Sequence, residues 1–382
     1  MDLTDDFVMD EFKCMANETM NCSRIKINLT EIMNVEPSEK HPIVYFSQRF
    51  YAYVTPIIFT VGLFGNIMSL SVFLTKNLRN MSASRYLSAL SIADMSTLIF
   101  YVFGEWLRRG LKYISPGIKI SFLDTEGVCQ IWLYLNYFSR FMSAWLIVCF
   151  TCERFIGVCM PLRRRNLGTL KETTKIISAL TVVAAVIVSY KPFLSDVHTI
   201  RTRTSCASKK NYVYESFVLD SIYALLITFV PFIVITTLNV LIVRRLIIRN
   251  RRQKHNLITE ESHIRLEFTF ILLAISIFFI AFNLPFFATW FRNFVHSHFL
   301  YPNETNIESD KGSVDYWIGV LLITRTIFYM NYCINFFLYS FTGAYFRKEL
   351  KGLFFTTYQK YDHCKHSVNT HETHMLRRNS WV

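Results

Sequence analysis

Residues 61–74 read VGLFGNIMSLSVFL, and residues 270–282 read FILLAISIFFIAF. Both stretches lack charge and would place apolar side chains on every face of a helix, as expected for a helix in a membrane or deep inside a large protein. The whole chain favours the membrane, because 52% of its 382 residues are hydrophobic and only 18% are charged. Soluble chains usually carry about 25% charged residues.

Seven blocks are long enough to cross a bilayer, which takes about 20 apolar residues in a helix. They lie near 50–75, 83–107, 127–159, 174–195, 215–245, 264–295 and 314–341. One such block could be a buried helix of a soluble protein, but seven in succession predict an all-α membrane protein, a seven-transmembrane helix bundle. We expect an N-terminal arm over 1–49, the bundle over 50–343, a short amphipathic helix over 344–356 and a tail over 357–382.

Basic residues set the expected orientation, because Lys and Arg near membrane ends stay on the cytoplasmic side. With the N-terminus extracellular, the basic runs at 163–165, 244–254 and 347–348 all fall inside. The net charge of +13 is then a cytoplasmic excess, and nucleic acid is not needed to explain it. The same runs suit anionic membrane lipids. We expect a multi-pass protein of the plasma membrane.

Asn-X-Ser/Thr sites test this topology, since glycan is added on the lumenal side. Asn80 lies in the first inner loop, where no glycan is expected. The residues MDLTDDFVMDEFK have neither a basic start nor an apolar core, so we expect the first helix, not a cleaved signal peptide, to direct insertion. The expected glycosylation sites are Asn17, Asn21, Asn28 and Asn303.

Most of the nine cysteines lie in apolar blocks, where they act as small hydrophobic residues. Cys129 opens the third block at its outer end and Cys206 lies in the second outer loop, so both face an oxidising compartment. A disulfide between them would pin the loop over the mouth of the bundle. Cys14 and Cys22 could pair with each other, remain unpaired or pair otherwise.

Polar residues inside membrane helices are costly and usually mark function. In chain order the blocks carry Gly65-Asn66, LSIAD at 90–94, ERF at 153–155, FNLP at 282–285 and NFFLY at 335–339. This ordered set resembles the rhodopsin-like (class A) G-protein-coupled receptors, over about 50–356. The stretch SRFMSAWLIVCFTCERF at 139–155 is similar to invertebrate neuropeptide receptors of the FMRFamide type.

The resemblance implies a receptor that binds an extracellular neuropeptide and activates heterotrimeric G proteins, with arrestin as a further partner. Glu153, Arg154 and Tyr339 are the implied G-protein coupling residues. Two alternatives remain open: a peptide-binding decoy that does not signal and, with less support, a seven-helix transporter or channel, although the sequence shows no internal repeat or Gly-rich break. No enzyme is expected, because no nucleophile with a nearby base and no metal-ligand spacing occurs.

Four positions depart from the family pattern: Asn239, Arg265, Asn283 and Phe336 replace the usual Tyr, acid, Trp and Pro. An acid at position 265 would pair with Arg154, whereas Arg265 carries the same charge and cannot hold it. We therefore expect Glu153 and packing to hold the inactive state. The altered switch positions add weight to the decoy alternative.

The resemblance also implies a hydrated sodium pocket at mid-bundle. Oxygen ligands suit a hard cation, and a buried carboxylate such as Asp94 needs a counterion or a proton. Asp94 is therefore the candidate Na⁺ ligand, and no other cofactor is expected; the alternative is a network of hydrogen bonds without an ion. The network residues are Asn66, Asp94, Ser143, Asn283, Asn331 and Asn335.

Two absences narrow the ligand class. Asn136 stands where amine receptors carry an Asp, and Tyr329 stands where a retinal lysine would be. The outer halves instead combine both charges with aromatic rings, which suits a peptide better than an apolar lipid. Glu105 or Asp220 would pair with the guanidinium of an Arg-Phe-amide end. The expected ligand-binding residues are Glu105, Asn136, Tyr137, Arg140, Asp220, Tyr223, Trp290, Arg292, Arg325 and Tyr329. For Arg140, an ion pair with Glu105 and ligand contact are both open.

The tail adds two expectations. Cys364 is a palmitoylation candidate. The end Ser380-Trp381-Val382 resembles a PDZ-domain ligand, which such a domain would bind as an added strand; a solvated tail is the alternative.

Overall fold

The computed structural model describes residues 41–115, 117–118, 121–160, 169–200, 203–252, 260–295 and 307–353. Six helices are long and apolar enough to cross a membrane, and a bent pair, Asp315–Tyr332 with Asn335–Thr342, makes a seventh span. The predicted all-α membrane bundle is confirmed. Several expected features lie outside the described residues: Cys14, Asn17, Asn21, Cys22, Asn28, Asn303, Cys364 and the end Ser380–Val382.

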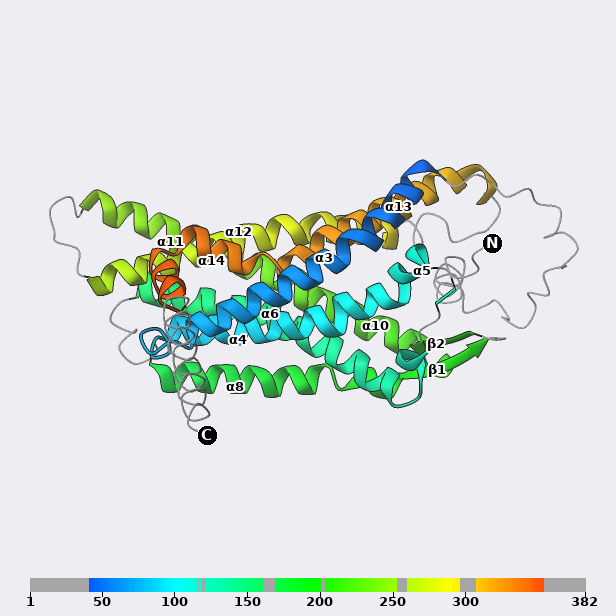
Figure 1. Ribbon diagram of the computed structural model, residues 1–382, viewed down its shortest axis with the longest axis horizontal. Coiled ribbons are helices and arrows are strands. Elements are labelled where there is room, and N and C mark those ends of the chain that lie inside the picture. Colours follow the sequence, from blue (N-terminus) through cyan, green and yellow to red (C-terminus); the bar gives the residue numbers. More distant parts are fainter. Residues whose placement is uncertain are drawn as a thin grey trace, which may run out of the picture.

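The first four spans alternate in direction along one long axis (Figure 1). The first is α3 (Pro42–Phe73), and the third is α6 (Val128–Cys159). The second comprises α4 (Ser82–Thr97), the π-helices η2 (Leu98–Phe103) and η3 (Trp106–Gly110), and α5 (Leu111–Ile114). The fourth comprises α8 (Leu170–Ile187) and α9 (Tyr190–Leu194). The first helix starts earlier than the apolar block, because Pro42 suits the first turn and the His41 side chain caps it.

The remaining spans complete the bundle. The fifth comprises α10 (Val213–Ala224), η6 (Leu225–Phe229) and α11 (Val230–Arg252), and the sixth is α12 (Glu260–Val295). The seventh comprises α13 (Ile307–Tyr329), the 3₁₀ turn η9 (Met330–Tyr332) and α14 (Asn335–Thr342). A helix over 344–353 follows.

A β-hairpin lies at one end of the bundle, beyond the fourth span (Figure 1). Strands β1 (Ser195–Ile200) and β2 (Arg203–Ser208) pair antiparallel, with Val197 opposite Cys206. We call this the hairpin end. The opposite end, where α6 finishes just beyond Arg154, is called the Arg154 end.

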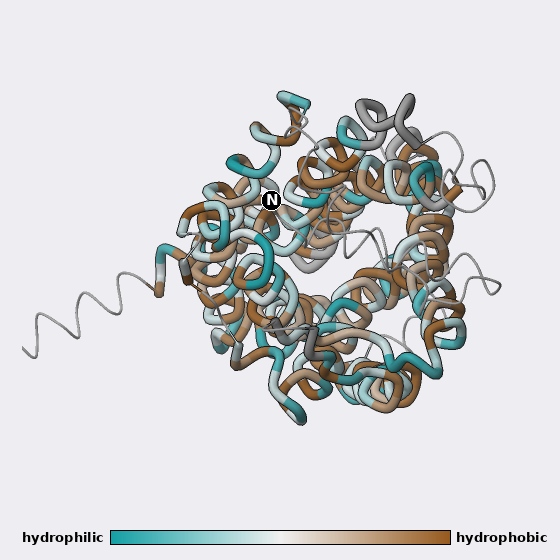
Figure 2. The backbone as a smooth tube through the Cα atoms, turned by 90° about the vertical axis from the view of Figure 1, so that its right-hand side faces the viewer, coloured by the Kyte–Doolittle hydropathy of each residue, from teal (hydrophilic) through white to brown (hydrophobic). Residues whose placement is uncertain are grey.

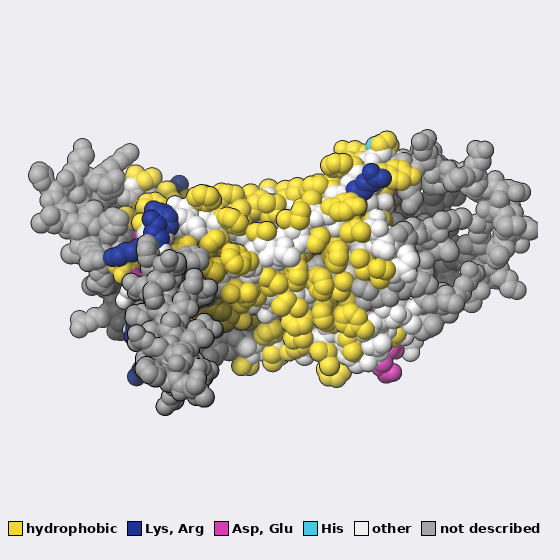
Figure 3. Space-filling model, in the orientation of Figure 1, with side chains coloured by type: hydrophobic (Ala, Val, Ile, Leu, Met, Phe, Trp, Pro, Cys, Tyr) yellow, Lys and Arg dark blue, Asp and Glu magenta, His cyan; other side chains and the backbone are white. Residues whose placement is uncertain are grey.

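The outer surface of the bundle is apolar. Phe64, Val186 and Ile277, from three different spans, are each more than 60% exposed. Hydrophobic side chains form a continuous belt across the middle, and the visible charged side chains lie toward the two ends (Figure 3). The end-on view shows the helices packed around a common axis (Figure 2). Such a belt would be costly in water but matches the hydrocarbon layer of a membrane.

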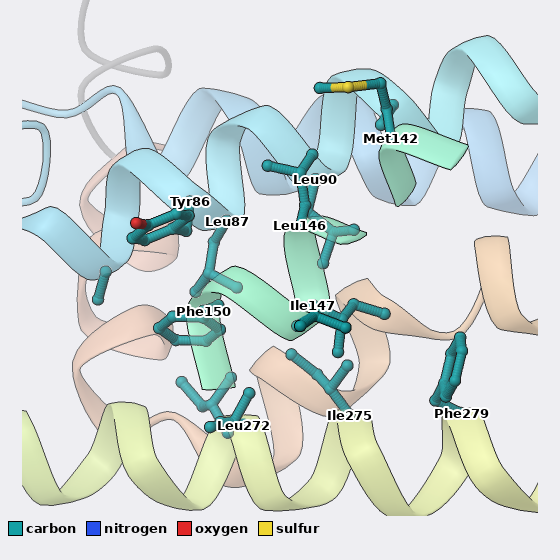
Figure 4. Close-up of a cluster of buried hydrophobic side chains, with 14 of the residues drawn as sticks. Tyr86, Leu87, Leu90, Met142, Leu146, Ile147, Phe150, Leu272, Ile275 and Phe279 are labelled. Atoms are coloured by element: carbon teal, nitrogen blue, oxygen red, sulfur yellow. The ribbon is translucent and has the colours of Figure 1, made fainter. Parts of the chain in front are cut away.

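The core lies between α4, α6 and α12. Leu87 and Leu90 from α4 meet Leu146 and Phe150 from α6, while Leu272 faces them from α12 (Figure 4). All five side chains are at most 2% exposed. This contact fixes α6 against its neighbours along the half of the bundle toward the Arg154 end.

Candidate ligand and signalling sites

A buried carboxylate joins three spans at mid-bundle. Asp94 accepts one hydrogen bond from the Ser143 hydroxyl and one from the Asn335 side-chain amide, each at 2.6 Å. These residues come from α4, α6 and α14, and Asp94 is 1% exposed. The structure therefore brings together three of the six residues that the sequence placed in this network. Two directed bonds to one carboxylate tie the seventh span to the second and third.

The seventh span bends by 52° just before Asn335, without a proline. The 3₁₀ turn η9 breaks the helix there, and the Asn66 amide donates to the Tyr332 carbonyl at 2.8 Å. Gly65 permits the close approach of α14, since an added Cβ would come within 2.9 Å of Phe336 Cβ. Asn66 thus satisfies a carbonyl at the break. The span is bent although Phe336 stands where the family usually has proline.

A small cavity lies beside the carboxylate network. It is lined by Arg140, Ser143, Asn283, Asn331 and Asn335 together with apolar side chains of α6, α12 and the seventh span. Its volume is about 20 Å³, which is room for about one water molecule. The Asn283 amide donates to the Phe279 carbonyl of its own helix at 2.7 Å. The wall offers hydroxyl and amide oxygens that suit Na⁺, alongside one fixed positive charge, Arg140.

The two carboxylates expected to bind a ligand guanidinium already have cationic partners. Glu105 lies 3.0 Å from Arg109 and 3.7 Å from Arg325. Asp220 lies 2.6 Å from the Lys191 ammonium and also accepts from the Tyr190 hydroxyl at 2.8 Å. Both acids are therefore neutralised within the chain.

Arg140 lies among tyrosine rings instead. Its guanidinium carbon lies 4.3 Å from the Tyr101 ring centroid, 4.8 Å from that of Tyr137 and 5.4 Å from that of Tyr223. The structure shows no ion pair between Arg140 and Glu105, one of the two alternatives left open above, because Arg109 and Arg325 lie against that carboxylate. Cation–π contacts with three rings stabilise the guanidinium without neutralising it.

The other expected ligand residues fall into separate places. Tyr137 and Tyr223 belong to the Arg140 cluster, with ring centroids 4.5 Å apart and the Tyr223 hydroxyl donating to the Tyr137 carbonyl at 2.7 Å. Asn136 is buried one turn away. Tyr329 packs on Tyr51 and Tyr101, whereas Arg292 lies 3.8 Å from the Trp317 ring centroid and Trp290 packs on Phe287. The structure thus brings Tyr137, Arg140 and Tyr223 together, while Trp290 and Arg292 contact other partners.

At the Arg154 end, Arg154 bonds to its neighbour. Its guanidinium donates to both carboxylate oxygens of Glu153, at 2.7 Å for the Nη2 to Oε1 bond, and Ser82 donates to the same carboxylate at 2.8 Å. Tyr339 is fully buried against Phe73 and Phe346. The side chain of Arg265 lies outside the described residues.

Glu267 on α12 was not among the residues predicted from the sequence. Its carboxylate accepts from the backbone amides of Tyr345 and Phe346, at 2.7 and 3.4 Å, in the first turn of the helix over 344–353. A carboxylate at a helix N-terminus is favoured by the exposed amides and the helix dipole. The sequence offers one indication of this contact, an acidic residue near the start of the sixth span, two residues after Arg265.

The expected disulfide is confirmed. Cys129 and Cys206 are bonded, with their Cα atoms 5.7 Å apart. The bond joins the start of α6 to β2, so the hairpin is fixed over the hairpin end. Asp124 accepts from the Cys206 backbone amide at 3.2 Å and lies 3.4 Å from Arg108. Its pKa is nevertheless raised, because burial disfavours the charged carboxylate.

Comparison with known proteins decides the family. The model of the 7 transmembrane receptor (rhodopsin family) matches residues 65–339, which is most of the chain. The chain belongs to this family. The resemblance drawn from the polar motifs is thereby confirmed, and the chain is a receptor rather than an enzyme.

Individual relatives are distant. The neuromedin U receptor homolog nmur-2 of Caenorhabditis elegans is 32% identical over 126 residues, 33% of this chain and 30% of that protein. The thyrotropin-releasing hormone receptor of Gallus gallus is 31% identical over 161 residues, 41% of this chain and 38% of the relative. The cysteinyl leukotriene receptor 1 of Homo sapiens is 24% identical over 313 residues, 80% of this chain and 85% of the relative. In the first two cases the chain spans well under half the length of the relative.

Proposed function

We propose that this receptor binds an extracellular peptide at the hairpin end and activates heterotrimeric G proteins at the Arg154 end, from a plasma membrane with the N-terminus outside. The observation that carries the proposal is the cluster of Arg140 with Tyr101, Tyr137 and Tyr223. A cationic and aromatic cluster is suited to groups found on peptides. The names of two relatives, the neuromedin U receptor homolog nmur-2 and the thyrotropin-releasing hormone receptor, agree with a peptide.

Signal transfer would run along α6, which carries Arg140, Ser143 and Arg154. At a rise of about 1.5 Å per residue, Arg140 and Arg154 are about 21 Å apart along the helix. A ligand can shift the bundle only if it binds one conformation better than another. Movement of α6 relative to α4 would alter the bonds from Ser143 to Asp94 and from Ser82 to Glu153. The Glu153 carboxylate also holds Arg154, so the loss of its contact with α4 would free the guanidinium for a G protein.

We also propose that Asp94, with Ser143 and Asn335, holds Na⁺ in the conformation without agonist. The support is the burial of the Asp94 carboxylate and the side-chain oxygens of Ser143, Asn331 and Asn335 in the otherwise mostly apolar wall of the adjoining cavity. Occupancy by sodium and by agonist would then be linked reciprocally.

Other partners belong to the same proposal. Arrestin would bind at the Arg154 end, anionic lipids at the basic runs, and a PDZ protein at Val382. Glycans on the N-terminal arm and palmitate on Cys364 fit a receptor with this orientation.

The test is a screen of synthetic neuropeptides against cells that express the receptor, with calcium and cyclic AMP readouts. An activating peptide that is inactive in matched cells lacking the receptor supports the proposal. A peptide that binds at the cell surface but changes neither readout, and does not stimulate nucleotide exchange on any G-protein class, would favour the decoy alternative, which the substitutions Arg265, Asn283 and Phe336 make worth testing.

A further inference from the structure

Once the ion pairs among the expected ligand-binding residues are taken into account, the charge without an ionic partner is positive. The two acids best placed to receive a basic ligand group, Glu105 and Asp220, are each in contact with a cation of the chain. A ligand guanidinium would have to displace Arg109 and Arg325 from Glu105, or Lys191 from Asp220. Displacement leaves at least one cation of the chain without its partner for each ligand cation that is bound, so the exchange offers little net gain.

Arg140 differs from these cations. Among the described residues it forms no ion pair, and its buried Nε atom has no hydrogen-bond partner. Three tyrosine rings lie against the guanidinium, and apolar side chains such as Ile227, Ile275 and Phe328 line the cavity that it borders. A cation in such surroundings is costly unless an anion neutralises it.

We propose that Arg140 binds a carboxylate of the ligand, so that the activating peptide carries an anionic group beside an apolar or aromatic residue. The guanidinium presents N–H groups in a plane that can bind both oxygens of a carboxylate. The tyrosine rings exclude water from this pair, and their aromatic faces suit an apolar or aromatic flanking side chain. This inference rests on the proposed peptide-receptor function and names the chemistry of its ligand. It replaces the Arg-Phe-amide end expected from the sequence, whose guanidinium needs a free acid.

The direct test uses small probes on the purified full-length receptor. N-acetyl-L-phenylalanine carries the carboxylate, and N-acetyl-L-phenylalaninamide is its neutral counterpart. We expect the acid, but not the amide, to raise the thermal unfolding temperature, by an amount that increases with the logarithm of its concentration above its Kd. Arg140→Gln should weaken binding of the acid about tenfold or more, as expected for loss of hydrogen bonds to a charged group.

Two further variants make the test decisive. Arg140→Lys keeps the charge and should retain part of the acid effect, which also covers the case in which Arg140→Gln does not fold. Arg49→Gln removes an exposed arginine near the same end of the first span and should behave as wild type. Equal stabilisation of wild-type receptor by acid and amide, or an unchanged acid effect in Arg140→Gln, would overturn the proposal.

A second arm separates this inference from the proposed function. Peptides of identical sequence, made as free acids, as C-terminal amides, and as amides with an internal Asp or Glu, are screened on receptor-expressing cells. Activation by free acids identifies the C-terminal carboxylate, and activation by acidic amides identifies a side chain. If only neutral or basic amides activate, the carboxylate inference fails while the peptide receptor stands. If no peptide activates although the probe effect depends on Arg140, the anion site stands and the proposed function fails.

Discussion

Replacing Asn66 with alanine should destabilise the bend of the seventh span. The Asn66 amide donates to the Tyr332 carbonyl at 2.8 Å and to the Gly62 carbonyl at 2.9 Å. Tyr332 ends the 3₁₀ turn at the 52° break. A buried polar group left without its partner costs about 1–3 kcal/mol, whereas hydrogen bonds between membrane helices average about 0.6 and reach about 1.7 kcal/mol. Because the lost donor serves a carbonyl at a helix break, we expect the upper part of the membrane range, about 1–1.7 kcal/mol.

The measurement is equilibrium unfolding of the purified receptor in mixed micelles with increasing SDS, followed by circular dichroism. Ser71→Ala is the matched control, because the Ser71 hydroxyl is exposed and donates to the Ile67 carbonyl of its own helix, at 2.8 Å. It should change the free energy of unfolding by less than about 0.5 kcal/mol. If Asn66→Ala changes it no more than the control does, Asn66 does not stabilise the break and our account of the bend without proline is wrong.

Three further predictions concern other contacts. Cys129→Ser and Cys206→Ser should each lower the free energy of unfolding by the same amount, at most about 4.5 kcal/mol for the 77-residue separation. The double variant should lower it no further, and additive losses under non-reducing conditions would argue against a shared bond. Asp94→Asn should abolish the weakening of agonist binding by sodium, measured by competition in sodium against N-methylglucamine, and an unchanged sodium effect would leave a hydrogen-bond network without an ion. Glu267→Gln should raise basal nucleotide exchange, because a neutral amide holds the backbone amides of 345 and 346 less strongly. Lys351→Gln, a change at an exposed side chain of the helix over 344–353, is the control, and equal basal rates in both variants would refute this role.

The spans were predictable because the hydrocarbon layer acts on each of them separately. Twenty apolar residues such as those around 61–74 or 270–282 identify a span without knowledge of its neighbours. Helix ends are less predictable, since caps and lengths beyond the lipid depend on local chemistry, as the start of α3 at Pro42 shows. The bend before Asn335 required knowledge of two spans, because the amide that stabilises it comes from α3.

The residue types of the candidate sites were also predictable, but their partners were not. The Glu105–Arg109 pair follows from (i, i+4) spacing and was within reach of the sequence. The Lys191–Asp220 pair joins α9 to α10 and depends on their packing. Sequence motifs therefore placed Arg140, Glu105 and Asp220 in one region, while the packing determined that both acids are paired and that the arginine faces tyrosine rings.

The central claim is that a peptide bound at the hairpin end activates a G protein through Arg154. The most direct measurement is peptide-stimulated GTPγS binding in membranes from cells that co-express the receptor and a defined G protein, with wild type and Arg154→Ala compared at equal surface expression. We predict that the peptide stimulates nucleotide exchange only through the wild-type receptor, while both proteins bind the peptide with similar affinity. Equal stimulation through Arg154→Ala would contradict the account.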